Sequence, residues 1–354
     1  MSEIASLTEF LETAGGRLRF FDMGRRVSKI PHDDFLKFER TELPYPQPLQ
    51  QQAWFALVFH DRESQDEPFI WFLRFPLDEQ GKLVLAARDD FMHRLVESLG
   101  ENLEAARKGE HLQAALEENP YVFQPKQERL AVLHAKLTLL LKQPASHYYN
   151  HAVDYFQGKL GWDQWSFLGY QGIADLAVRC AEPEMARQIA EAIPQLPASP
   201  LEALCHCLEN ESVPVAIAEA LCKRVEATLA EDEPDPQIVT AGIRGISNSI
   251  SLAHRDKLIG SVLNHPIASR SDVLTAVGGR AWEVLEDEGL RCHYLECLAA
   301  SDESQDFFNR VLADLLFLPA TRSFMLASLR DSKRSETLSE SIGEFFSRIR
   351  SPAT

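Results

Sequence analysis

The chain has 354 residues, of which 45% are hydrophobic and 25% are charged, proportions typical of a globular protein with more than one domain. Its formal net charge of −17 disfavours nucleic acid as a partner, because acidic side chains repel phosphates. No apolar run is long enough to span a bilayer, and the acidic N-terminus lacks the basic stretch of a secretory signal. We therefore expect a cytoplasmic protein without membrane insertion.

Residues 1–110 are predicted to form a small α+β domain with an antiparallel sheet. Apolar residues at helical spacing indicate a first helix within 4–13. The two clearest strands are apolar on both faces, so we expect both to be central and covered on each side. The predicted strands are 17–21, 25–30, 53–61, 67–76 and, as a further neighbour, 82–87, and the long helix that follows is 89–108.

The rest of the chain is predicted to be helical, with a connector at 111–160 and a repeat region at 161–354. Candidate helix caps stand at equal intervals of 36 residues: Asp163, Ser199, Asp235 and Ser271. A fixed period in this range is typical of stacked helix pairs, so we predict an all-α HEAT-like solenoid. The second helices are expected at 183–193, 214–230, 252–263 and 286–299, and a closing set at 304–318, 320–329 and 336–349.

Six scattered cysteines fall on predicted helices, which favours reduced, buried thiols over disulfides. Cys205, His206 and Cys207 are residue types that commonly bind metal ions. However, neighbours at i and i+2 on a helix point in different directions, so thiols of the core are the favoured interpretation.

A second candidate metal set is formed by His147, His151 and Asp154, which share one face of a predicted helix. The alternative, packing or surface histidines among neighbouring tyrosines, is favoured because no HExxH glutamate is present. We expect neither a metal nor a cofactor.

A local basic patch is predicted on the first hairpin, beside Phe20 and Phe21. Its members are Arg17, Arg19, Arg25, Arg26 and Lys29. Basic residues among aromatics can bind single-stranded nucleic acid, whereas alternation of this kind is equally typical of a half-exposed strand. Residues 1–110 carry 14 Lys/Arg against 20 Asp/Glu, so the patch is only local.

Two further groups have both a structural and a functional interpretation. The aromatic cluster Trp162, Trp165, Phe167 and Tyr170 is either a binding anchor or, as we favour, the joint between the connector and the first repeat. Gly242, Gly245, Gly278 and Gly279 lie inside predicted helices. They indicate either close approach of helices or a groove for a partner's backbone.

Catalytic motifs are missing from the sequence. It contains no GxSxG elbow, no phosphate loop and no dinucleotide GxGxxG. The paired acidic residues stand at apparent helix starts, where they stabilise the helix dipole. We therefore assign no catalytic residue and favour a non-catalytic protein.

The segments GRLRFFDMGRRVSKI and AWFALVF…PFIWFLRFPLDEQG, followed by an all-helical tail, resemble an uncharacterised gammaproteobacterial family classed as a domain of unknown function. The resemblance covers nearly the whole chain and implies no activity or site.

The leading functional hypothesis is a protein-interaction module or adaptor that presents a helical-repeat surface. Its expected contact residues are Arg244, Arg280 and Trp282, and its expected partner is a protein of unknown identity. The mixed domain is expected to supply a second contact or a homodimer edge. The alternative is a nucleic-acid-binding or DNA-processing protein on a HEAT-like scaffold, against which residues 111–354 carry 22 Lys/Arg and 33 Asp/Glu.

Overall fold

The computed structural model of the chain describes residues 6–12, 17–60, 68–99 and 119–350. The chain divides into two compact units. The first comprises Met1–Lys126 with Phe317–Pro319, and the second comprises Gln127–Leu316 with Ala320–Thr354. The helices of the predicted connector belong to the second unit, and the predicted boundary at residue 110 lies outside the described residues.

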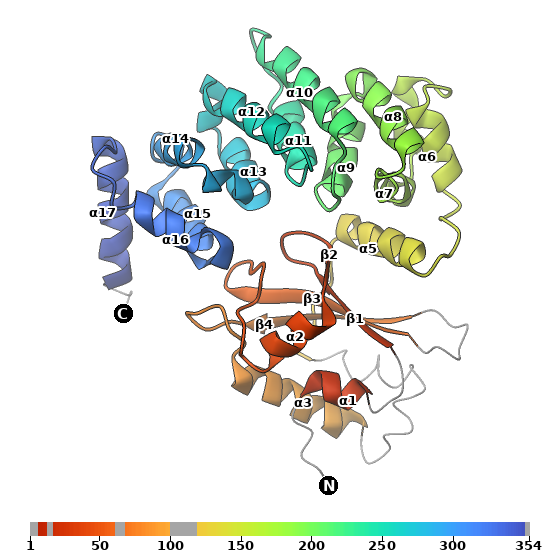
Figure 1. Ribbon diagram of the computed structural model, residues 1–354, viewed down its shortest axis with the longest axis vertical. Coiled ribbons are helices and arrows are strands. Elements are labelled where there is room, and N and C mark those ends of the chain that lie inside the picture. The colour runs from red at the N-terminus through yellow and green to blue at the C-terminus, as the bar shows by residue number, and fades with distance from the viewer. Residues whose placement is uncertain (1–5, 13–16, 61–67, 100–118, 351–354) are drawn as a thin grey trace. The chain divides into compact units, whose positions relative to one another are not determined.

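The first unit is built on a four-stranded antiparallel sheet with the order β2-β1-β3-β4 (Figure 1). The strands are β1 (Arg17–Asp22), β2 (Ser28–Ile30), β3 (Gln52–His60) and β4 (Phe69–Pro76). Phe20 pairs with Leu57, and Leu57 pairs with Trp71, so these three side chains form a row on one face. The sheet, followed by a helical region, confirms the predicted α+β class.

The segment 82–87 is not the strand that was predicted. Leu83 forms an isolated bridge to Leu77, and helix α3 (Leu85–Leu99) begins within the segment. A short apolar run does not by itself distinguish a strand from the first turn of a helix, which explains the error. The predicted loop 62–66 and the predicted helix beyond residue 99 lie outside the described residues.

β4 is not the doubly covered central strand that was predicted. On the side away from β3 it pairs with a short segment, in which Val122 forms a bridge to Leu73. The second face of β4 is partly open, since Phe72 is half-buried and Arg74 is exposed. The guanidinium of Arg74 lies over the ring of Trp54 at 5.4 Å, which gives this apolar strand a polar outer face.

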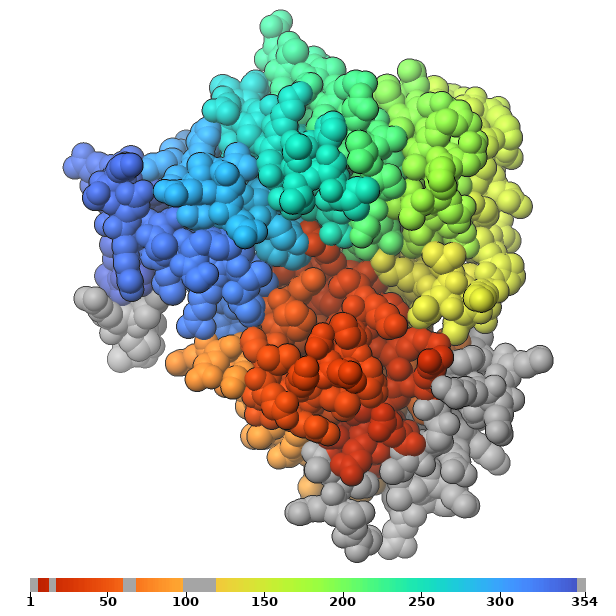
Figure 2. Space-filling model, in the orientation of Figure 1, coloured from red at the N-terminus to blue at the C-terminus, as the bar shows by residue number. Residues whose placement is uncertain are grey.

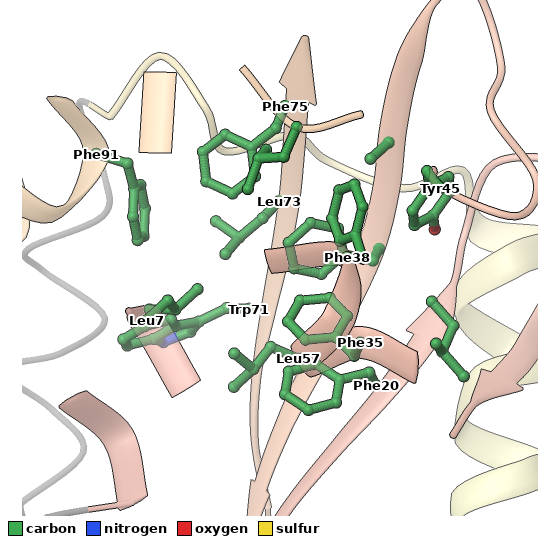
Figure 3. Packing of buried hydrophobic residues seen from close by; sticks show 14 of the residues in the cluster. Leu7, Phe20, Phe35, Phe38, Tyr45, Leu57, Trp71, Leu73, Phe75 and Phe91 are labelled. Carbon is green, nitrogen blue, oxygen red and sulfur yellow. The ribbon is translucent and has the colours of Figure 1, made fainter. Parts of the chain in front are cut away.

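Aromatic side chains fill the core on the other face of the sheet (Figure 3). Phe35 of α2 (His32–Glu39) stacks on Phe20 of β1, with ring centroids 3.7 Å apart. Phe91 of α3 meets Phe75 of β4 edge-on at 5.6 Å. Helices α2 and α3 therefore cover this face, as their apolar spacing requires.

A buried carboxylate holds the first helix, α1 (Leu7–Glu12), against α2. Glu39, the last residue of α2, accepts hydrogen bonds from the backbone N–H groups of Leu7 at 2.5 Å and Thr8 at 3.4 Å. These N–H groups have no partner within their own helix, so the carboxylate acts as a cap supplied from another element. Burial raises the pKa of Glu39 above its usual value, even though these bonds and the charge of Arg88 oppose the rise.

The second unit consists of helices arranged in two layers (Figure 1). Successive helices alternate between the layers, and each packs against the next member of its own layer. In Figure 2 these helices, coloured from yellow through green to blue, form a continuous band of atoms. The first layer contains α5 (Gln127–Leu140), α7 (Tyr170–Ala177), α9 (Ala198–Leu208), α11 (Pro236–Ile246) and α13 (Ser271–Arg280). The second contains α6 (Tyr149–Phe156), α8 (Pro183–Ala192), α10 (Val215–Leu229), α12 (Leu252–Leu263) and α14 (Glu288–Ala299).

Three α-helices and four 3₁₀ turns complete the second unit. The helices are α15 (Gln305–Phe317), α16 (Pro319–Ser328) and α17 (Glu336–Arg350). The turns are η2 (Trp162–Phe167), η3 (Ile193–Gln195), η4 (Pro266–Ser269) and η5 (Trp282–Glu286). The predicted second helices and closing helices agree with the observed ones to within two residues. Within the described residues, no helix has both the length and the apolar character needed to cross a membrane.

The four predicted caps fare differently. Asp235 caps α11 as expected, because its side chain accepts from the N–H of Gln237 at 2.9 Å. Neither serine is a cap, because α9 begins one residue before Ser199, at Ala198, and Ser271 is already the first residue of α13. Proline is tolerated throughout the first turn, where no N–H is needed, so the Ser-Pro pair did not fix the start.

The equal spacing of helix starts is also wrong. Asp163 lies inside the 3₁₀ turn η2, and the first α-helix begins only at Tyr170. The first-layer helices from α7 to α13 therefore start at intervals of 28, 38 and 35 residues. Helix pairs of this kind are held by packing of their apolar faces, which tolerates turns of different length.

Hydrogen bonds nevertheless join positions about one helix pair apart. The amide of Gln237 donates to Glu202 at 2.6 Å, and that of Asn248 donates to the carbonyl oxygen of Glu211 at 2.9 Å. Ser249 donates to the carbonyl oxygen of Val213, with which it also forms a parallel bridge. The separations along the chain are 35, 37 and 36 residues, so a structural period survives although the helix starts are unequal.

Candidate functional site

Two of the three predicted contact residues converge on one buried carboxylate in the first layer. Arg244 of α11 donates to both oxygens of Glu209, from Nε at 2.6 Å and from Nη2 at 2.9 Å. Nε of Arg280, the last residue of α13, lies 3.6 Å from the same carboxylate. Glu209 follows α9 directly, so this cluster connects three consecutive helices of the layer.

The electrostatics of this Glu209 cluster favour ionised groups. Burial raises the pKa of the Glu209 carboxyl, but the charges of Arg280, Arg244 and Arg129 outweigh that effect and hold the pKa below its usual value. The side chain of Glu209 is 3% exposed, whereas those of Arg244 and Arg280 are 24% and 22% exposed. Bidentate pairing of this kind fixes the geometry of the partners, so the cluster sets the register of α9, α11 and α13.

Trp282, the third predicted contact residue, begins η5 and is only 3% exposed. A buried tryptophan contributes mainly to packing. That Arg244, Arg280 and Trp282 contact a partner stays a prediction.

His206 lies beside the Glu209 cluster but does not form a catalytic pair with it. Burial and the charge of Arg244 lower the pKa of His206 to about 4. Its Nε2 stands 3.6 Å from Glu202, and at neutral pH this is a contact of a neutral ring with a carboxylate. Glu202 is itself occupied by the amide of Gln237.

The thiols on either side of His206 are core residues. Cys205 is fully buried, and its sulfur packs where α11 carries Gly245. Burial raises the pKa of Cys207 to about 12 and that of Cys205 still further, so both are protonated thiols. All six cysteines are free, in agreement with the expectation of reduced thiols.

The second candidate metal set is not assembled. The ring of His147 packs at a tilt against Tyr148, with ring centroids 3.8 Å apart, and Asp154 pairs with Lys159 at 2.8 Å. In the part of the chain that the structure describes, no three His, Cys, Asp or Glu side chains are grouped as metal ligands.

Folding buries part of the predicted basic patch and leaves Arg17 and Lys29 exposed. Phe20 and Phe21 are both buried, so neither ring is available for stacking on a base. Arg25 and Arg26 are buried as well, and the carboxylate of Asp22 accepts from the backbone N–H of each at 3.1 Å. Tyr45 donates to the same carboxylate at 2.7 Å, which fixes this turn after β1.

Three of the four helix glycines allow close approach of helices. An added Cβ would lie 2.2 Å from Val225 at Gly242, 2.7 Å from Cys205 at Gly245, and 2.4 Å from the hydroxyl of Tyr294 at Gly278. At Gly279, a Cβ would meet nothing within 4 Å. The structural interpretation therefore holds for the first three, and a need for close approach does not account for Gly279.

The aromatic cluster separates into two pairs. Trp162 packs edge-on against the buried Tyr155 of α6, as expected of a joint with the connector, and Tyr170 is half-buried on α7. Trp165 and Phe167 are exposed, at 40% and 73%. No feature of the sequence separates the two pairs, because all four residues are aromatic and closely spaced.

Comparison with known proteins gives a family and no activity. No curated protein and no solved structure matches the chain. The model of a family described as "Protein of unknown function (DUF3549)" matches residues 2–346, which is nearly the whole chain. The chain therefore belongs to this family.

Proposed function

We propose that the protein is a non-catalytic interaction module of the cytoplasm, in which HEAT-like helix pairs hold a surface for a protein partner. The observation that carries this proposal is that charged groups inside the second unit form ion pairs with one another. Glu209, Arg244 and Arg280 bind one another across three helices, and Lys136 pairs with Glu211 at 2.6 Å.

The candidate reactive groups of the described region have roles in packing instead. Burial raises the pKa of Cys180 to about 12 and that of Cys222 to about 11, and the pKa of His206 is lowered to about 4. A general base needs a pKa near the working pH, and a nucleophilic thiol needs a depressed one. The pKa values of these thiols are raised and that of His206 is lowered, both away from the values that catalysis needs, which supports binding rather than catalysis.

Crosslinking in the native cell tests the proposal. Full-length protein is treated with an amine-reactive crosslinker, and the linked peptides are identified by mass spectrometry. Lys159, Lys223 and Lys257 are exposed reporters on the second unit, and Lys37 is a matched exposed reporter on the first. We expect one stoichiometric protein partner, linked mainly through the second unit.

Recovery of nucleic acid in place of a protein partner, or of no specific partner at all, would contradict the proposal. Links only between two copies of this chain would replace the adaptor with a homodimer.

A further inference from the structure

The turn η2 presents two aromatic side chains to solvent from a rigid base. None of its six residues is buried, and Phe167 is the most exposed large hydrophobic side chain on the described surface. Trp165 stands two residues before it. Exposed aromatics of this kind are the side chains that most often carry binding energy at interfaces.

The base of η2 is fixed by its first residue. Trp162 meets the buried ring of Tyr155 edge-on at 5.5 Å, and the Tyr155 hydroxyl donates to the carbonyl oxygen of Trp162 at 2.9 Å. Gly158 and Gly161 have φ of +73° and +79°, which favours glycine, and a Cβ at Gly158 would lie 3.3 Å from the Trp162 ring. The turn is therefore pre-organised, which lowers the entropy lost on binding.

Neighbouring turns place acidic side chains along the same edge of the second layer. Arg224, near the end of α10, donates to the carbonyl oxygens of Pro194 and Leu196, which follow α8. Lys257 of α12 pairs with Glu226 of α10 at 2.7 Å. The contacts of Arg224 place the ends of α8 and α10 on one edge. Because successive helices alternate between the layers and α6 packs against α8, we place the turn after α6 on the same edge.

Four carboxylates on this edge have no ion-pair partner among the described residues. Glu231, Asp232 and Glu233 are exposed in the turn after α10, and Asp163 is exposed within η2 itself. Among the described residues, none of these four carboxylates has a Lys, Arg or His nitrogen within 4.0 Å. An apolar anchor beside unpaired carboxylates fits a ligand that is both apolar and basic.

We propose, on the basis of the interaction function above, that this edge docks an amphipathic basic helix of a protein partner. The apolar face of that helix packs on Trp165 and Phe167, and its Lys and Arg side chains face Asp163 and the acidic turn 231–233. Two helix-packing steps separate η2 from that turn, about 16–20 Å, which a helix of roughly 11–14 residues spans.

Fluorescence anisotropy tests the proposal with full-length protein and two labelled 14-residue amphipathic helices. Both peptides share a Leu/Phe face, and the polar face is Lys in one and Glu in the other. We expect the Lys peptide to bind, and Trp165→Ala or Phe167→Ser to raise its Kd at least tenfold. Neutralising the acidic turn (Glu231→Gln, Asp232→Asn, Glu233→Gln) should raise the Kd and flatten its salt dependence.

Ile250→Ser is the matched control, because Ile250 is also highly exposed but lies in the turn between α11 and α12, where a first-layer helix ends. This variant should bind the Lys peptide as the unmodified protein does. Absence of binding, equal binding of the Glu peptide, or equal losses in Phe167→Ser and Ile250→Ser overturns the docking edge. If the partner found by crosslinking is retained by Phe167→Ser, the module stands and only this site fails.

Discussion

Alanine substitutions at Gly242 and Gly279 should change stability in opposite directions. Both glycines lie inside first-layer helices, so each alanine gains about 1 kcal/mol of helix propensity. At Gly279 the new methyl group meets nothing within 4 Å, so Gly279→Ala should stabilise the protein by about 0.5–1 kcal/mol. This variant serves as the matched control.

At Gly242 the new Cβ would lie 2.2 Å from Cγ2 of Val225, where two carbon atoms prefer roughly 3.5–4.0 Å. Val225 is buried and β-branched, so its side chain has few other rotamers. Overpacking of this severity costs about 3 kcal/mol, and after the propensity gain Gly242→Ala should destabilise by about 2 kcal/mol.

Urea unfolding followed by circular dichroism measures both values. A double variant with Val225→Ala removes the obstructing methyl group, and we expect a favourable coupling energy of about 1–2 kcal/mol with Gly242→Ala. Equal effects of Gly242→Ala and Gly279→Ala, or strict additivity in the double variant, would refute close packing of α10 against α11.

Three further predictions concern the buried titratable groups. Glu209→Gln should destabilise the protein by about 1–3 kcal/mol at pH 7, which is less than for a fully buried pair because both arginines are partly exposed. Since the pKa of Glu209 is depressed in the folded protein, the difference in stability should shrink as the pH falls below about 4.5. Unfolding measured as a function of pH checks this. Glu39→Gln should have the opposite sign, because the raised pKa of Glu39 means that the fold disfavours its charge; the variant should be more stable at pH 7 and lose that advantage once the carboxyl of the unmodified protein is protonated in acid. In a thiol-reagent assay at pH 8, Cys292 and Cys297 should react before the four buried cysteines, and all six should react in urea; rapid labelling of Cys205 or Cys207 in the native protein would contradict their core positions.

Periodicity in the sequence predicted most of the elements, because apolar spacing follows directly from which face is buried. The strands β3 and β4 and the second-layer helices α8, α10, α12 and α14 lie within two residues of their predicted bounds. Local capping signals were weaker: Asp235 caps its helix, whereas Ser199 does not. A cap stabilises a helix start by only about 1 kcal/mol, and packing of the apolar face outweighs it.

The candidate site was harder to predict because its members are far apart in the chain. Arg244 and Arg280 were predicted contacts, but Glu209 was not predicted to lie between them. Arg244 lies 35 residues after Glu209, and Arg280 lies 36 after Arg244, so charges of opposite sign at one-repeat spacing were the available signal. This spacing indicates contact only if the helices form a two-layer stack, because one repeat then separates residues on neighbouring helices of the same layer.

The ion pairs of Arg244 and Arg280 with Glu209 affect where a partner would bind. An arginine bound to a buried carboxylate offers a partner only its remaining N–H groups, and a partner that displaced Glu209 would leave this carboxylate unpaired at a cost of several kcal/mol. In the part of the chain that the structure describes, the side chains of Trp165 and Phe167 form no hydrogen bond or ion pair that would have to break, and water already covers much of both rings. Binding at η2 therefore buries apolar surface and leaves the first-layer ion pairs intact. Binding that displaces Glu209 from Arg244 or Arg280 weakens the contacts that hold α9, α11 and α13 in register.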